Sequence, residues 1–96
     1  MKIAFDCDGT LRDYDDKPKE VIVNMLKLLS EAGHHIIVWS GGGKDYAQSV
    51  CRACGIVDYV TECRSKVERG DVDVAFDDEN VGLALTNIQV VKPKEW

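Results

Sequence analysis

The sequence lacks the features of a membrane-spanning, secreted or nucleic-acid-coating protein. No apolar run in its 96 residues approaches the roughly 20 residues of a membrane span. Only three apolar residues separate Lys2 from Asp6, so no signal peptide is predicted. Basic residues are in deficit, with 12 Lys and Arg against 17 Asp and Glu and a net charge of −5. This balance argues against a broad nucleic-acid surface, which is usually basic, but a nucleic-acid end is still possible as a substrate.

The sequence also lacks internal repeats and low-complexity segments, and its composition is that of an ordinary globular protein. It is 45% hydrophobic and 30% charged. Its length predicts one small domain, residues 1–96, without room for a second core. We expect a cytoplasmic protein with reduced thiols and no membrane partner.

The four cysteines do not form a paired metal or redox pattern. Cys51 and Cys54 have the C-x-x-C spacing, but no second pair accompanies them. They fall near the end of a predicted helix, whereas redox pairs lie at a helix start, where the thiolate is stabilised. We therefore favour a structural role over a zinc or redox centre.

Apolar runs and helical periodicities alternate along the chain, which predicts an α/β fold with a mostly parallel five-stranded sheet. Strands are expected at residues 1–5, 36–39, 56–60, 72–76 and 88–91, and helices at 18–32, 44–54 and, capped by Asn80, 81–85. Gly33 is predicted to end the first helix in a left-handed conformation. Residues 61–70 are expected to be irregular or a short helical connection. Right-handed crossovers would place helices on both faces, giving three layers, and the tail, 92–96, is expected to be exposed, with Trp96 docked on the surface or in an oligomer contact.

Polar side chains follow the predicted strands where the strands end. Asp6 and Asp8 follow the first strand, and Ser40 with three glycines follows the second. Asp77 and Asp78 follow the fourth. The carboxyl ends of parallel strands meet at one edge of a sheet, where ligands bind. Neighbouring carboxylates are unfavourable there unless a cation or a shared proton relieves the repulsion.

These residue types suit phosphoryl chemistry. Carboxylates from two strand ends can hold Mg²⁺, which prefers oxygen ligands. The hydroxyl of Ser40 and the amides of Gly41, Gly42 and Gly43 can bind phosphate oxygens, assisted by the N-terminus of the following helix. A lysine supplies a mobile positive charge, one carboxylate can attack phosphorus, and a second can transfer the proton.

The order of these motifs resembles the haloacid dehalogenase (HAD) superfamily of phosphohydrolases. The segment from Asp6 to Leu11, DCDGTL, fits the first motif of that family, Asp-x-Asp-Gly-Thr. An apolar strand ending in Ser40 fits the second motif, Lys66 is the best candidate for the third, and Asp77-Asp78 fits the fourth. The resemblance covers nearly the whole chain and implies a Rossmann-like, HAD-like fold.

The resemblance implies a Mg²⁺-dependent phosphatase that forms an aspartyl-phosphate. Asp6 resembles the nucleophile. Asp8 resembles the general acid/base, and its backbone carbonyl would also contact the metal. Asp77 resembles the main metal ligand beside Asp6, with Asp78 bound directly or through water.

The remaining site residues are expected to bind the transferred phosphoryl group. They are Thr10, which would also orient Asp8 or its loop, together with Ser40, Gly41, Gly42 and Lys66. Lys44, which follows the glycine loop, is the alternative to Lys66. We favour Lys66 because its place before the fourth strand matches the order of the family.

The segments where family members insert a cap domain are short here. Residues 12–17 and 61–70 are too short to form one, so we expect an open, capless site. The resemblance implies that such a site admits a macromolecular phosphate, on a nucleic-acid end or a phosphoprotein. It also implies that a small phosphometabolite can be the substrate, in which case a homo-oligomer would cover the site. The alternative function is a non-catalytic HAD-like domain that binds a phosphorylated ligand or a protein partner. A two-component receiver does not fit, because its acidic pair follows the first strand and its phosphoacceptor the third.

Overall fold

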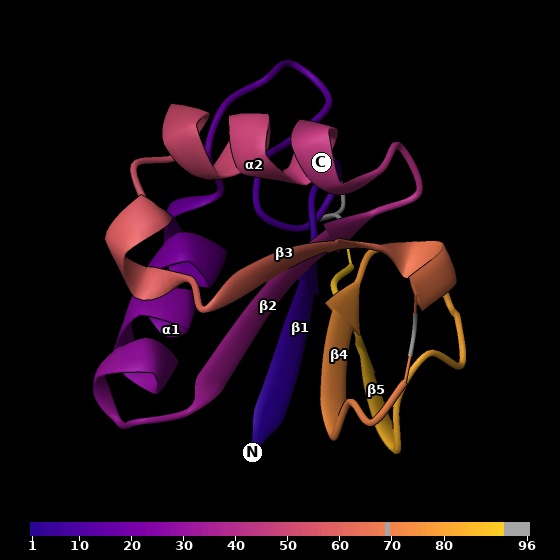
Figure 1. Cartoon of the computed structure of the whole chain (residues 1–96). Coiled ribbons are helices and arrows are strands. Elements are labelled where there is room, and N and C mark those ends of the chain that lie inside the picture. Colours follow the sequence, from indigo (N-terminus) through magenta and orange to yellow (C-terminus); the bar gives the residue numbers. More distant parts are fainter. Residues whose placement is uncertain (69, 92–96) are drawn as a thin grey trace.

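The computed structural model describes residues 1–68 and 70–91, so the predictions for the tail at 92–96 fall outside the described part. Its core is a five-stranded, fully parallel sheet with strand order β3-β2-β1-β4-β5 (Figure 1). The elements in chain order are β1 (Lys2–Asp6), α1 (Glu20–Glu31), β2 (His35–Ser40), α2 (Lys44–Ala53), η1 (Val57–Tyr59), β3 (Glu62–Ser65), η2 (Lys66–Glu68), β4 (Val74–Asp77) and β5 (Thr86–Gln89). The predicted α/β class is confirmed, and the residues that the structure describes form no cap domain.

The strand register brings the polar strand ends to one edge. β1 lies at the centre of the sheet, between β2 and β4. Phe5 pairs with both Val38 and Phe76, so the last residue of β1, Asp6, lies level with the end of β4. Ser40 at the end of β2 pairs with Ser65 at the end of β3. Four parallel strands therefore end side by side, as the sequence predicts.

Both α-helices pack on one face of the sheet. Their inward side chains, which include Val23, Leu26 and Val50, form one hydrophobic cluster with Ile3 and Phe5 of β1. Successive strand residues point to opposite faces, so the alternate residues of β1 and β2 belong to the other face. The cluster on the helix-covered face is the main core of the protein. It forms because the amphipathic periodicity of the two helices places their apolar side chains on one side.

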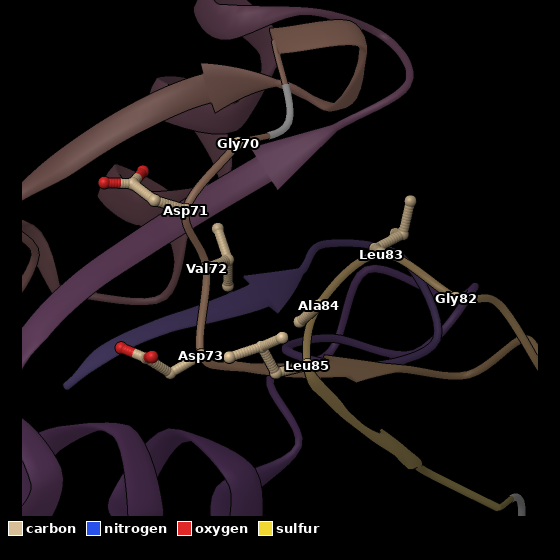
Figure 2. A pocket seen from close by; sticks show the side chains of 8 residues that line it. All are labelled: Gly70, Asp71, Val72, Asp73, Gly82, Leu83, Ala84 and Leu85. Atoms are coloured by element: carbon tan, nitrogen blue, oxygen red, sulfur yellow. The ribbon is translucent and has the colours of Figure 1, made fainter.

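The opposite face has no helix among the described residues, which differs from the expected three layers. There Trp39, Ile37 and the small residues Ala4 and Ala75 are covered by residues 70–73 and 82–85. These two segments lie side by side, joined by hydrogen bonds from the amides of Leu85 and Thr86 to the carbonyls of Val72 and Asp73. Figure 2 shows the side chains of both segments around a pocket of about 350 Å³, with Val72, Ala84 and the exposed Leu85 among its lining residues.

Two predicted elements are wrong and one is shifted. The strand predicted at residues 56–60 does not form; Val57–Tyr59 is the 3₁₀ helix η1, and β3 follows at Glu62–Ser65, inside the segment expected to be irregular or a short helical connection. β3 is an edge strand whose Glu62 and Arg64 pair with each other at 2.6 Å, so it carries little apolar signal. No helix forms at 81–85, because the side chain of Asn87 accepts the amides of Leu83 and Ala84 and holds a turn. The fifth strand is Thr86–Gln89 rather than 88–91.

The other boundaries agree with the prediction to within a few residues. Gly33 has the expected left-handed conformation, with φ +93°. α1 begins at Glu20, two residues after Pro18, because the amide of Lys19 bonds to Leu11 in the preceding loop. In the part of the chain that the structure describes, no helix is long and apolar enough to cross a membrane.

Candidate active site

Asp6 ends β1 at the centre of the converging strand ends, and the residue is only 7% exposed. The ammonium of Lys66 lies 2.7 Å from Oδ1 of Asp6 and 2.7 Å from Oδ2 of Asp77. The hydroxyl of Thr10, fully buried, donates to Oδ2 of Asp6 at 3.2 Å. Both oxygens of Asp6 thus have a donor, and Lys66 links the ends of β1 and β4.

Burial and charge have opposite effects on the pKa values of Asp6 and Lys66. Burial raises the pKa of Asp6 to about 6, while the hydrogen bond from Lys66 works in the opposite direction. For Lys66, burial favours the neutral amine, but hydrogen bonds to Asp6 and Asp77 outweigh it and raise its pKa. Lys66 therefore supplies a persistent positive charge beside Asp6.

Asp6 is one of three carboxylates that gather at the strand ends. Oxygen atoms of Asp6, Asp77 and Asp78 all lie within 4.8 Å of one another. Gly9, with φ +85°, lies against Asp78 so closely that an added Cβ would overlap the carboxylate. The hydroxyl of Tyr14 donates to Oδ2 of Asp78 at 2.6 Å. This all-oxygen donor set, on three side chains that converge, fits Mg²⁺ or another hard cation.

Asp8 has hydrogen-bond partners that differ from those of the clustered carboxylates. Arg12 Nε donates to its Oδ1 at 3.1 Å, and the hydroxyl of Tyr46 donates to its Oδ2 at 2.5 Å. Asp8 is not among the clustered carboxylates, so a metal contact from its backbone carbonyl remains a prediction. The two aspartates of one motif therefore lie in different surroundings.

The second loop places a hydroxyl and a helix start at the same edge. Ser40 is buried at the end of β2, and its Oγ accepts the amide of Gly42 at 2.9 Å. Gly41 and Gly42 are exposed, and α2 begins at Lys44 directly after Gly43, which has φ +102°. The exposed loop and helix start can face an incoming anion.

The family comparison agrees with this geometry. The haloacid dehalogenase-like hydrolase family matches residues 3–64, well over half of the chain. The chain belongs to this family. Comparisons with curated proteins and with solved structures found no match. The matched residues of this HAD-like hydrolase end before Lys66, so Lys66 and the Asp77-Asp78 pair join the site through the parallel sheet.

The structure brings most of the predicted site residues together. Thr10 is predicted to bind phosphate and to orient Asp8 or its loop, and its buried hydroxyl donates to Asp6. Lys66 contacts the site carboxylates directly. Within the described residues Lys44 forms no ion pair with them, so the geometry favours Lys66. The pocket of Figure 2 contains none of the site carboxylates.

Three residues at the site were missed by sequence reasoning. Arg12 lies four residues after Asp8 in an irregular loop, where this separation has no fixed geometry and gives no usable signal. Tyr14 and Tyr46 reach the aspartates from positions 64 and 38 residues away from their partners. No local pattern marks such long-range contacts, so only the folded chain reveals them.

Proposed function

We propose that this hydrolase cleaves phosphomonoesters in two steps through an aspartyl-phosphate on Asp6. The observation that carries the proposal is the setting of Asp6, a buried carboxylate with the Lys66 ammonium on one oxygen and two further carboxylates beside it. A nucleophilic carboxylate next to a fixed cation and a metal-competent acidic cluster suits attack on an anionic phosphoryl group.

The cofactor in this proposal is Mg²⁺, held by Asp6, Asp77 and Asp78, with the backbone carbonyl of Asp8 as a further ligand. When bound, the ion neutralises phosphate charge and orients the phosphoryl group. The clustered carboxylates support this assignment, because three converging acids need a cation to offset their repulsion. Lys66 provides part of that offset, because its ammonium contacts both Asp6 and Asp77.

In both steps of the proposed reaction, Asp6 carries the phosphoryl group and Asp8 transfers the proton. In the first step an oxygen of Asp6 attacks phosphorus, the ester bond breaks, and the leaving oxygen takes a proton from Asp8. In the second step Asp8 takes a proton from water, the water oxygen attacks phosphorus, and the bond to Asp6 breaks to release phosphate. Lys66, Ser40 and the amides of Gly41 and Gly42 bind the oxygens of the transferred group, so they stabilise the charge that develops on it.

The open site favours a substrate whose leaving group extends into solvent. Gly41 and Gly42 are exposed, and Tyr14 at the mouth is largely exposed. Phosphate on a nucleic-acid end, a phosphoprotein or a small metabolite fits this opening. The four free cysteines suit a reducing cytoplasm.

The deciding experiment compares Asp6→Asn with the unmodified chain on 4-nitrophenyl phosphate in the presence of Mg²⁺. Loss of the nucleophile should lower kcat by about 1000-fold or more. Asp71→Asn is the matched control, because it makes the same change in an exposed carboxylate that pairs with Lys2. EDTA should stop turnover and added Mg²⁺ restore it. Retained activity in Asp6→Asn, or a turnover rate that EDTA does not lower, would contradict the proposal.

The alternative, a non-catalytic phosphate-binding domain, predicts a different result. Beryllium fluoride, which mimics a phosphoryl group, would bind, yet no phosphorylated metabolite or oligonucleotide in a broad panel would be hydrolysed. The same panel narrows the substrate class if turnover is found.

A further inference from the structure

The carboxylate of Asp8 is held from both sides by residues outside the sequence motifs. Arg12 Nε donates to one oxygen at 3.1 Å and the Tyr46 hydroxyl donates to the other at 2.5 Å. A charged donor and a short hydroxyl contact make these hydrogen bonds stronger than an ordinary neutral pair. The direction in which Asp8 points is thus determined by two partners.

Arg12 and Tyr46 also bind each other. Arg12 Nη2 donates to the hydroxyl of Tyr46 at 2.8 Å, and the guanidinium carbon lies 5.6 Å from the centre of the tyrosine ring. Asp8, Arg12 and Tyr46 therefore form a closed ring of three hydrogen bonds, which we call the Asp8 ring. Members of such a network support one another, so loss of one partner loosens the others.

The Asp8 ring joins the two loops on which the proposed phosphoryl site is built. Asp8 and Arg12 belong to the turn after β1, where the amides of Leu11 and Arg12 both donate to the carbonyl of Cys7. Tyr46 belongs to the first turn of α2, and an added Cβ on Gly42 would come within 3.4 Å of its ring. Tyr46 thus connects the glycine loop to Asp8, from 38 residues away in the chain.

We propose that Arg12 and Tyr46 are positioning residues that hold Asp8 in place for proton transfer. The inference rests on the proposed phosphatase reaction, in which Asp8 protonates the leaving oxygen. A general acid acts only within hydrogen-bond reach of the atom that it protonates. A free aspartate side chain samples several rotamers, and the Asp8 ring selects among them without either partner touching the substrate.

The leaving group provides the test, because the need for a proton depends on its basicity. The alkoxide of β-glycerophosphate leaves poorly unless it is protonated, whereas the phenolate of 2,4-dinitrophenyl phosphate leaves without a proton. The quantity kcat/KM reports the steps up to the first irreversible one, here formation of the aspartyl-phosphate. The ratio of kcat/KM for the two substrates therefore isolates proton donation by Asp8.

Tyr46→Phe removes one hydroxyl from the Asp8 ring and leaves the aromatic ring that packs on Gly42. We expect kcat/KM to fall about 10-fold with β-glycerophosphate and less than about 2-fold with 2,4-dinitrophenyl phosphate. Arg12→Lys, which keeps the charge but loses the guanidinium fork, should act in the same direction. Tyr14→Phe is the matched control. It removes the tyrosine hydroxyl that donates to Asp78 and does not touch Asp8, so kcat/KM should change by the same factor for both substrates. Equal losses with Tyr46→Phe would overturn the proposal.

A double variant separates positioning from a general structural role. In an Asp8→Asn background, Tyr46→Phe should cause no further loss with β-glycerophosphate, since the group that it positions is already gone. A further loss of the full 10-fold would show that Tyr46 acts by another route.

A crystal structure of Tyr46→Phe gives a readout that does not depend on turnover. The Asp8 carboxylate should leave the position that it has in the unmodified protein, while Asp6 stays beside Lys66. An unmoved Asp8 would overturn the positioning role. If the unmodified chain hydrolyses neither substrate, the proposed function fails, and this structure still decides whether Tyr46 places Asp8.

Discussion

The two faces of the sheet are covered in different ways. On the helix-covered face, β1 and β4 present Phe5 and Phe76, whose rings stack with centroids 4.7 Å apart beneath α1 and α2. On the opposite face the same strands present Ala4 and Ala75, and the irregular segments 70–73 and 82–85 lie over them. Small side chains at the centre of this face let backbone approach the sheet without a helix between them.

This difference extends to the candidate active site. Ser40 ends β2 and Tyr46 lies in the first turn of α2, on the helix-covered side. Lys66, Asp77 and Asp78 lie in or beside the connections that flank β4, where loops provide the cover. Segments with little buried apolar contact open at a lower free energy than a packed core. The helices therefore provide the rigid frame, and the loop-covered side carries the cationic and metal-competent groups.

The largest expected effect lies on the helix-covered face. Leu26 of α1 is fully buried in the main core. Leu26→Ala should lower the free energy of unfolding by about 3 kcal/mol, because the rigid surroundings leave a cavity. Urea denaturation measures it. Leu28→Ala in the same helix is the matched control: its side chain is 69% exposed, and its effect should stay within about 0.5 kcal/mol. A loss below about 1 kcal/mol for Leu26→Ala would contradict the rigid-core description.

An intermediate effect is expected on the loop-covered face. Val72 is 2% exposed and packs on Trp39 and Ala75. Val72→Ala should lower the free energy of unfolding by only about 1 kcal/mol, less per removed carbon than Leu26→Ala, because irregular segments can settle into the vacated space. The same denaturation series tests this. A loss of about 2 kcal/mol or more would mean that both covers are equally rigid.

The smallest effect is expected at the outer surface of the loop cover. Leu85 is 87% exposed, although its amide bonds to Val72. Leu85→Ser should change the free energy of unfolding by no more than about 0.5 kcal/mol, since the hydrogen bond uses the backbone and the side chain buries little area. Thermal unfolding at matched protein concentration measures it. A clear destabilisation would show that Leu85 is buried in solution against a further surface.

Much of the fold was predictable because the strongest periodicities coincide with the main core. The apolar run of β1 and the helical spacing of α1 and α2 each match the face that they bury. The third strand was misplaced because Ile56, fully buried, supports the core from a turn while β3 forms at the sheet edge from polar residues. At 81–85 a local hydrogen bond from Asn87 outweighed the weak helical pattern.

The candidate site was predictable as a set of residues but not as an arrangement. The order of Asp6, Ser40, Lys66 and Asp77 along the chain, together with a parallel sheet, is enough to expect them at one edge. The sequence does not show that Thr10 turns to Asp6, because a four-residue separation in a loop with a left-handed Gly9 has no regular geometry.

The sequence by itself determined the family, the parallel α/β class and the identity of the acids, since these depend on local runs and on the order of motifs. Tertiary structure alone decided which face received helices, that Lys66 contacts both Asp6 and Asp77, and that the two aspartates of one motif have different partners. The physical reason is that these outcomes depend on contacts between residues distant in sequence. Lys66 reaches Asp6 and Tyr46 reaches Asp8 only when strand pairing and helix packing have brought their elements together.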